Sequence, residues 1–242
     1  VPRDIEVLKE EVKTIKEKLN DVDFINIPDL LSCDTRSWDG ANIAKAYFDD
    51  VVPHLRAMDF DFTKELPIKD KLREYNIKEV LVIEGDPPQS MLYQVYPTIS
   101  TDIIKKFSEE MPEITVYAGI DQYRSSMKEE EYRIRRKQLA GAKGFFTQPF
   151  FDMRYLEMYA DLLDGLDIYW GVSPVLSERS VSYWRNKNNV IFPKDFEPTL
   201  EWNIEFARKV IDFARKHNHN VYLMPIKAKI MPYFCLLYTS PS

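Results

Sequence analysis

Apolar and polar positions alternate along this chain with two different periods. Residues 5–19 carry an apolar residue at every third or fourth position, which predicts an amphipathic helix. Residues 79–83 are almost continuously apolar, which is typical of a strand buried on both faces. Strands are predicted at 24–27, 51–56, 79–83, 114–118, 144–147, 167–172 and 220–224. Helices are predicted at 5–19, 40–50, 67–75, 101–111, 128–139, 153–163, 177–186 and 202–217, with a broken helix near Ala228.

A few residues refine these boundaries. Pro53 lacks a backbone N–H and is expected to interrupt the strand at 51–56. Ser100 or Thr101 is expected to cap the helix at 101–111, because a hydroxyl accepts a hydrogen bond from the free N–H groups of the first turn. Ser177 is expected to cap the helix at 177–186 for the same reason.

The order of the elements favours a parallel α/β fold. Seven predicted strands are each followed by a helix, and strict alternation implies a parallel sheet with right-handed crossovers. No Gly-x-Gly-x-x-Gly turn is present, which disfavours an open dinucleotide-binding sheet. A (β/α)8 TIM barrel fits better, with the missing first strand expected just before Val1. No low-complexity linker divides the chain, so residues 1–234 are interpreted as one incomplete barrel domain.

Composition narrows the range of functions. The chain has 242 residues and a net charge of −6, and no basic cluster dominates it. These features argue against a nucleic-acid groove and against a polybasic membrane surface. No apolar run approaches the roughly 20 residues that cross a bilayer, and the amino end does not resemble a signal peptide. Cys33 and Cys235 do not make a disulfide framework, so a soluble cytoplasmic protein is expected, with no nucleic-acid or membrane partner.

Both ends of the sequence are interpreted as cut. Residues 235–242 resemble the translation of a sequencing adapter, and we expect them to be non-native. The chain begins with Val1 rather than Met, as though a strand had just ended. We therefore expect a fragment that lacks the first strand and the natural carboxyl end, and that is catalytically inactive alone.

Asp86 is the first candidate for chemistry, because parallel α/β proteins bind ligands at the carboxyl ends of strands. It lies in a Gly-Asp-Pro-Pro turn, residues 85–88, after a buried strand. Its carboxylate is expected to stabilise positive charge on a ligand or to accept a ring N–H. The alternative is an aspartate that caps its own turn. The apolar strand and the further charge of Glu84 favour the functional interpretation.

Gln148 is the second candidate. It directly follows the predicted strand at 144–147 and precedes Pro149, Phe150 and Phe151. A side-chain amide at a strand end, with aromatic rings beside it, suits a flat heteroaromatic ligand with a hydrogen-bonding edge. The alternative is a glutamine that faces solvent and two phenylalanines of the core.

His54 and Lys137 are further candidates with ordinary alternatives. His54 fits a general acid or base, a phosphate or ring contact, or a satisfied core residue. Lys137 lies in an Arg-Arg-Lys run on a charged helix, where a solvated face is the ordinary interpretation. No Cys and His cluster has metal-ligand spacing, and neither a Gly-x-x-x-x-Gly-Lys loop nor a Gly-x-Ser-x-Gly turn is present.

These motifs together resemble the methylenetetrahydrofolate reductase family, in the same order and at compatible spacing. The resemblance covers nearly the whole chain up to about residue 232, and the block at 140–152 is its most specific part. The matching segments are Pro53-His54-Leu55, Gly85-Asp86-Pro87-Pro88, Lys137 to Asp152 with Ala140-Gly141-Ala142 and Thr147-Gln148-Pro149-Phe150-Phe151-Asp152, and Gly171-Val172-Ser173-Pro174-Val175.

The resemblance implies an eight-stranded barrel that reduces 5,10-methylenetetrahydrofolate to 5-methyltetrahydrofolate, with hydride from NAD(P)H that usually passes through FAD. By matching position, it implies that Asp86 is catalytic beside folate and flavin, that Gln148 binds folate, and that Trp184 packs on the substrate. It assigns the flavin cofactor to His54, Gly85 and Lys137. The implied partners are folate and a nicotinamide nucleotide, with a homo-oligomer or a partner subunit as alternatives.

The sequence departs from the family pattern near the expected flavin. Glu84, Pro28 and Gly119 stand where flavin-binding members commonly carry Arg, Thr and Tyr. Negative charge at Glu84 would oppose a flavin diphosphate. The family's general acid, a Glu on the first strand, would lie upstream of Val1. These departures leave three alternatives: a flavin-independent reductase, a non-catalytic or methyl-transfer-associated folate-binding subunit, and a barrel hydrolase or lyase that uses Asp86 with His54.

Overall fold

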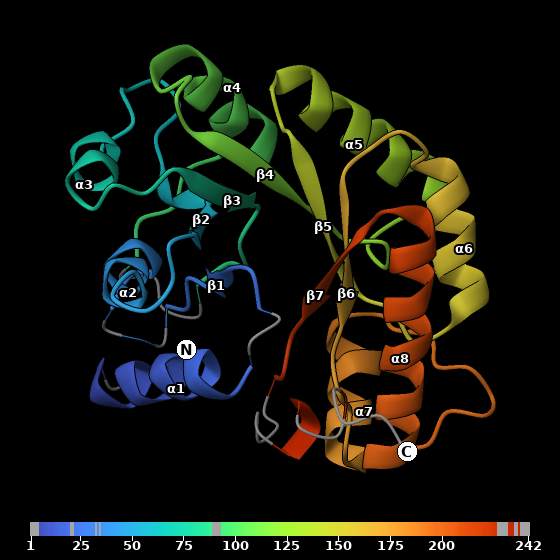
Figure 1. Cartoon of the computed structure of the whole chain (residues 1–242). Coiled ribbons are helices and arrows are strands. Elements are labelled where there is room, and N and C mark those ends of the chain that lie inside the picture. Colours follow the sequence, from blue (N-terminus) through green and yellow to red (C-terminus); the bar gives the residue numbers. More distant parts are fainter. Residues whose placement is uncertain are drawn as a thin grey trace. The chain divides into compact units, whose positions relative to one another are not determined.

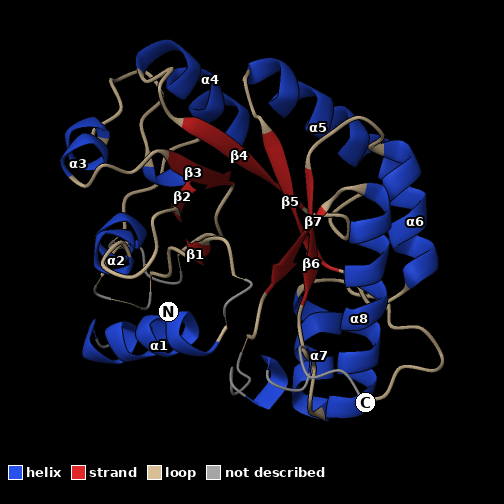
Figure 2. Ribbon diagram, in the orientation of Figure 1, coloured by secondary structure: helices blue, strands red, loops and turns tan. Residues whose placement is uncertain are grey.

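The computed structural model describes residues 5–19, 22–31, 33, 35–88, 93–226, 232–234 and 237. Strands and helices alternate along the described chain (Figure 1, Figure 2). The chain divides into two compact units, Val1–Gly119 with Arg136–Lys143 and Ile120–Arg135 with Gly144–Ser242. Each unit has its own run of parallel strands. None of the helices in the described part of the chain combines the length and the apolar character that crossing a membrane requires.

The first unit is built on four parallel strands in chain order. They are β1 (Ile25–Ile27), β2 (Val51–Arg56), β3 (Glu79–Ile83) and β4 (Thr115–Ile120), of which Ile120 belongs to the second unit. Its helical elements are α1 (Ile5–Lys18), α2 (Ser37–Ala44), η1 (Ala57–Asp59), α3 (Lys69–Glu74) and α4 (Ser100–Glu110). β3 has the bounds that were predicted from the sequence, residues 79–83.

The two faces of this sheet differ in polarity. Side chains alternate between faces along a strand, and residues in register on neighbouring strands share a face. Val82 and Ala118 are in register and fully buried. The other face carries His54 and Arg56 on β2, together with Leu81, which is in register with His54. One face is therefore apolar core, and the other presents polar groups towards the carboxyl ends of the strands.

The second unit contains three parallel strands, β5 (Gly144–Pro149), β6 (Ile168–Val172) and β7 (Asn220–Leu223). Its helices are α6 (Met153–Leu162), α7 (Glu178–Lys187) and α8 (Leu200–His217), and α5 (Met127–Ala140) begins in this unit and ends in the first. Ser177 caps α7 by accepting a hydrogen bond from Ser180 N at 3.2 Å, which confirms the predicted cap.

The parallel α/β prediction is confirmed, since seven strands are present and the recorded strand pairs within each unit are parallel. The eight-stranded barrel and the single domain stay predictions. The predicted broken helix near residue 228 lies outside the described residues.

Two boundary predictions in the first unit are wrong. The helix predicted at 40–50 is α2, Ser37–Ala44, because its small residues form the packing face: a Cβ on Gly40 would lie 3.0 Å from Ile27 Cγ2. Pro53 does not interrupt β2. The ladder to β1 ends at Pro53 and the ladder to β3 begins at His54, so the strand changes partner where its backbone donor is missing.

Two further boundaries differ at strand and helix ends. The cap of α4 is Ile99, and Ser100 is the first helical residue, because its backbone N–H and hydroxyl both donate to Glu84. The strand predicted at 144–147 extends through Pro149, so Gln148 lies within β5 rather than after it.

Candidate functional site

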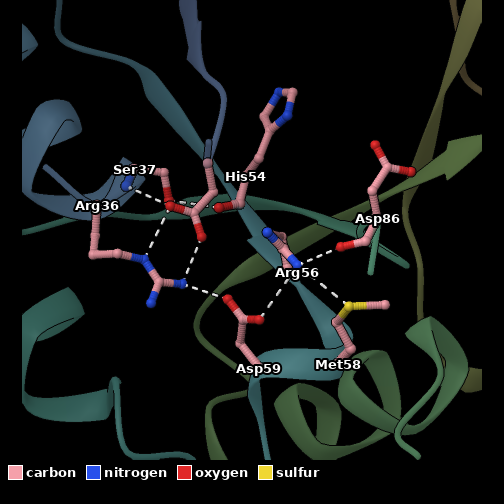
Figure 3. A network of polar contacts seen from close by, with 8 residues as sticks. Arg36, Ser37, His54, Arg56, Met58, Asp59 and Asp86 are labelled. Atoms are coloured by element: carbon pink, nitrogen blue, oxygen red, sulfur yellow. Dashed lines mark hydrogen bonds and ion pairs between the residues drawn. The ribbon is translucent and has the colours of Figure 1, made fainter. Parts of the chain in front are cut away.

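An ion-pair network joins the segments that follow β1 and β2 in the first unit (Figure 3). Arg36 Nη2 donates to Asp29 Oδ2 at 2.6 Å and to Asp59 Oδ2 at 2.7 Å. Arg56 Nη2 lies 3.7 Å from Asp59 Oδ1. Burial lowers the pKa of Arg36, but the hydrogen bonds and charges of Asp29 and Asp59 outweigh burial, so this pKa is raised overall. Two arginines and two aspartates thus form a charge-balanced network.

The Arg36→Met variant is expected to lose about 2 kcal/mol of unfolding free energy. It leaves the Asp29 carboxylate, with a side chain only 1% exposed, with Ser37 N at 3.2 Å as its described partner. Breaking a buried pair costs about 3–5 kcal/mol, and the smaller value allows for the partial exposure of Arg36. Urea unfolding measures the loss. The matched control is Arg73→Met, which breaks the half-exposed pair with Glu113 and is expected to cost less than about 1 kcal/mol. Equal losses in both variants would contradict the role given to the network.

Arg56 also fixes the turn that carries Asp86. Its Nη2 donates to the carbonyl oxygen of Asp86 at 2.7 Å. Gly85 has a φ of +86°, and a Cβ there would lie 2.9 Å from Arg56 Nε, so the turn requires glycine. The Asp86 carboxylate is exposed and points away from the network (Figure 3). It makes no hydrogen bond with a described residue, so the turn-capping alternative is not observed among those residues.

Glu84 is engaged at the start of α4. Its carboxylate accepts hydrogen bonds from Ser100 N at 3.1 Å and from Ser100 Oγ at 2.6 Å. A carboxylate at this position is stabilised by the free N–H groups and the dipole of the helix. The charge of Glu84 is therefore compensated at α4 rather than left facing a ligand.

His54 is a buried and neutral imidazole on β2. It is 7% exposed, and burial lowers its pKa to about 4. Its Nε2 is buried without a hydrogen-bond partner among the described residues, so the alternative of a satisfied core histidine is not observed there. Asn26 on β1 is in register with Val52 and shares the face of His54, and both polar atoms of its amide lack a described partner as well. Such buried atoms are rare, and each requires an explanation such as a ligand or water.

Lys137 is buried at the carboxyl end of α5. It is 7% exposed, and its Nζ donates to Gly119 O on β4 at 2.6 Å. The interpretation of Lys137 as part of a solvated helix face is therefore wrong. The helix ends three residues later. The hydrogen bond places the ammonium group beside the carboxyl end of β4, within the first unit.

In the second unit, β5 is irregular where Gln148 lies. The three steps from Phe146 to Pro149 face only two steps on β6, from Tyr169 to Gly171, which makes a β-bulge at Thr147 and Gln148. Gly171 N donates to Thr147 Oγ1 at 2.8 Å. A Cβ on Gly171 would lie 2.6 Å from Thr147 O and 2.8 Å from Gln148 O, so only glycine allows this approach. Bulges of this kind re-aim side chains next to functional sites.

The backbone of Gln148 is held by the side chain of Gln122, which lies in the loop after β4. Gln148 N donates to Gln122 Oε1 at 3.1 Å, and Gln122 Nε2 donates to Gln148 O at 2.7 Å. The side-chain amide of Gln148 is half-buried and makes no hydrogen bond with a described residue. That amide is therefore available to a ligand, while the backbone of the same residue is fixed.

Aromatic rings from three neighbouring strands meet on one face of the second unit. Phe146 stacks on Tyr169 with ring centroids 4.1 Å apart and planes within 7° of parallel. Tyr222 meets the edge of Phe146 at 5.2 Å. Phe146 and Tyr169 are only 3% and 8% exposed, so this stack belongs mainly to the buried core. The aromatic residues named from the sequence, Phe150 and Phe151, are buried in the core as well, as the alternative interpretation had them.

Trp184 lies on α7 within a hydrophobic cluster of the second unit. It is 4% exposed, and its ring centroid lies 5.9 Å from that of Phe151. Val175, Val181 and Val190 complete the buried part of this cluster. The implied packing of Trp184 on the substrate stays a prediction.

The predicted site residues are thus divided between the units. The first unit holds His54, Gly85, Asp86 and Lys137, and the second holds Gln148 and Trp184. His54 and Asp86 make no hydrogen bond with each other, so the pairing that a hydrolase or lyase would need is not formed. The sequence interpretation missed Gln122 because the predicted strand stopped at residue 118. With β4 ending at Ile120, Gln122 stands two residues after a strand, which is the signal that marked the other candidates.

No protein-family model matches the chain. A curated 5,10-methylenetetrahydrofolate reductase from Buchnera aphidicola subsp. Schizaphis graminum (strain Sg) is 22% identical over 147 residues, which cover 59% of this chain and 50% of that protein. The chain therefore spans about half the length of the curated relative that it matches.

Solved structures support the fold. An uncharacterized protein from Clostridium thermocellum that binds two copies of 5-methyl-5,6,7,8-tetrahydrofolic acid superposes with a TM-score of 0.62 at 14% identity, over 96% of this chain and 87% of that chain. Oxaloacetate acetylhydrolase superposes with a TM-score of 0.53 at 11% identity, over 95% and 86% of the two chains. At such identities these structures show the shared fold alone. The chain is therefore similar in sequence to a methylenetetrahydrofolate reductase, and it shares its fold with a protein that binds 5-methyl-5,6,7,8-tetrahydrofolic acid.

Proposed function

We propose that this chain binds a reduced folate, and that its parent protein reduces 5,10-methylenetetrahydrofolate to 5-methyltetrahydrofolate with hydride from NAD(P)H. The observation that carries the proposal is the side-chain amide of Gln148. It lies on a bulge near the carboxyl end of a parallel strand, its backbone is fixed, and it has no described hydrogen-bond partner. Ligands of parallel α/β proteins bind at this end of the strands.

The chemistry of a pterin ring suits these groups. The ring is flat, and its edge alternates hydrogen-bond donors and acceptors, which a glutamine amide can meet with one of each. The curated reductase and the neighbour that binds 5-methyltetrahydrofolic acid support a folate as the ligand class.

Asp86 is the proposed catalytic residue. Opening of the methylene bridge puts positive charge on the folate, and the resemblance assigns Asp86 as the carboxylate that stabilises such charge. The backbone of Asp86 is fixed by Arg56 and by the glycine turn, whereas its carboxylate is exposed and makes no described hydrogen bond. A fixed backbone with a free carboxylate suits this electrostatic role.

The residues near Gly85 do not fit a flavin diphosphate. Arg36 and Arg56 are both paired within the network, and Lys137 donates to Gly119 O. Glu84, which stands where flavin-binding members commonly carry Arg, is bound by Ser100 and supplies no positive charge to a diphosphate. We therefore propose no step that passes through FAD, and hydride transfer from NAD(P)H is the proposed source of reduction.

A folate-binding subunit without redox chemistry is the second candidate. It is favoured by Glu84 and Pro28, which stand where flavin-binding members of the family commonly carry Arg and Thr. Folate-dependent oxidation of NAD(P)H by the complete parent protein distinguishes the two functions. The reductase predicts turnover, and the subunit predicts folate binding without it.

Titration of the chain with 5-methyltetrahydrofolate by calorimetry tests the proposed ligand. The Gln148→Ala variant is expected to bind about tenfold more weakly, because a ligand group loses its hydrogen-bond partners. The matched control is Gln138→Ala, which removes the same amide from the exposed face of α5 and should leave the affinity unchanged. If the unaltered chain does not bind, the folate assignment fails. If both variants bind as the unaltered chain does, the role of Gln148 fails.

A further inference from the structure

We propose that Gln122 is a positioning residue, which sets the direction of the Gln148 side chain by holding both backbone polar groups of Gln148. The inference rests on the proposed function, because it concerns the same binding site. Gln122 touches no ligand in this proposal. It acts through the backbone of the residue that does.

The side-chain amide of Gln122 bonds the backbone of Gln148 as the backbone of a neighbouring strand would. Gln122 accepts from Gln148 N at 3.1 Å and donates to Gln148 O at 2.7 Å. An N–H can only donate and a carbonyl can only accept, so the two partners fix which end of the Gln122 amide carries oxygen and which carries nitrogen. We refer to this arrangement as the Gln122–Gln148 pair.

The pair lies where the strand ladder is irregular. At the bulge, β5 carries one residue more than β6 between the flanking register points, so one residue of β5 has no strand partner of its own. Gly171 N, the β6 group at this level, donates to the side chain of Thr147. The side-chain amide of Gln122 therefore supplies hydrogen bonds to the backbone of the bulge.

Gln122 is itself fixed by its neighbours. It is 1% exposed, and its backbone carbonyl oxygen accepts a hydrogen bond from Tyr155 Oη at 2.6 Å. Tyr123 Oη donates to Pro149 O at 2.8 Å, next to the pair. Burial raises the pKa of Tyr123 and of Tyr155 above the usual value, so both hydroxyls keep their protons at neutral pH. The pair is therefore buried and surrounded by these neutral hydrogen-bonding groups.

These contacts explain how Gln122 positions the side chain of Gln148. Binding sites depend on side chains held to within about half an ångström by their supporting residues. The side-chain amide of Gln148 makes no hydrogen bond with a described residue, so its direction depends strongly on the backbone at the bulge. Loss of the pair frees that backbone and costs ligand affinity without removing a ligand contact.

The Gln122→Glu variant tests the proposal through its pH dependence. An ionised carboxylate can still accept from Gln148 N, but it has no proton for Gln148 O. At pH 7.5 the variant is expected to bind 5-methyltetrahydrofolate at least about fivefold more weakly than the unaltered chain. Burial raises the pKa of the introduced carboxyl, and the protonated acid again donates and accepts, so at pH 5 its affinity should return to within about twofold of the unaltered chain.

Two further variants make the test specific. Gln122→Met has similar size but no hydrogen-bonding group, so it should bind weakly at both pH values. Gln138→Glu adds the same charge on an exposed position of α5 and should bind as the unaltered chain does. Asp121, Glu130, Tyr123 and Tyr155 lie near the pair, so each affinity is compared with that of the unaltered chain at the same pH.

Amide hydrogen exchange at Gln148 N, measured without ligand, separates this proposal from the proposed function. Faster exchange at Gln148 with weaker folate binding in Gln122→Glu, and recovery of both at pH 5, support it. Faster exchange with unchanged affinity overturns the positioning role, and so does a weak affinity that does not recover at pH 5. Absence of folate binding in the unaltered chain defeats the proposed function, and unchanged exchange at Gln148 in both Gln122 variants defeats the proposed pair on its own.

Discussion

The Trp184→Ala variant should lose about 3–5 kcal/mol of unfolding free energy. The indole is 4% exposed and packs against Phe151, Val181 and Val190 in the cluster of the second unit. Alanine removes most of these contacts and leaves a cavity, because the helix backbone of α7 cannot move inwards to fill it. Urea unfolding followed by circular dichroism measures the loss.

Two further variants separate the packing role of Trp184 from a role in substrate binding. Tyr183→Ala, at the preceding position of α7 where the side chain is 42% exposed, should lose only about 1 kcal/mol. Trp184→Phe keeps an aromatic ring in the cluster and allows folate affinity to be measured in a folded chain. A severalfold weaker affinity in Trp184→Phe would support substrate packing. A loss below about 1 kcal/mol in Trp184→Ala would contradict the core position described above.

Acid should destabilise the chain through His54 by about 3 kcal/mol in total. Burial holds the pKa of His54 near 4 in the folded chain, whereas an unfolded chain has a value near 6.5. As the pH falls below 6.5, the unfolded chain binds the proton first, and protonation pulls the equilibrium towards unfolding. The stability that the neutral imidazole preserves is present above pH 6.5 and is lost progressively towards pH 4.

Unfolding free energies between pH 7.5 and pH 4.5 measure this effect. The His54→Gln variant keeps a neutral polar side chain that does not titrate, so its stability should depend less steeply on pH. The unaltered chain, measured in the same buffers, is the reference. An identical slope in both proteins would show that His54 does not titrate between its folded and unfolded states as described.

The strands could be predicted from sequence because their signal is local. Residues 79–83 are apolar on both faces, and β3 has those bounds. The helix at 37–44 could not be placed in the same way. Its packing face consists of Ser37, Gly40, Ala41 and Ala44, whose small side chains carry little apolar pattern, and the contact with Ile27 that selects them is made by a distant segment.

The candidate site was partly predictable for the same reason. Strand ends mark Asp86 and Gln148 without any knowledge of their partners. The pairing of Gln122 with Gln148 and the compensation of Glu84 by Ser100 depend on loops meeting across many residues of sequence. Neither contact leaves a pattern in its own segment. The burial of Lys137 is a similar case, since a run of three basic residues carries no sign that its last member turns inwards.

The charge balance of the Arg36–Asp59 network has a kinetic consequence. Its two guanidinium groups and two carboxylates lie within a few ångströms of one another, so their fields cancel beyond a Debye length of about 8–10 Å. Electrostatic steering of an anionic ligand requires a net field that extends farther than this. These four groups therefore contribute little to the steering of an anion towards the ends of β1 and β2, and a salt dependence of association would have to come from other charges of the chain.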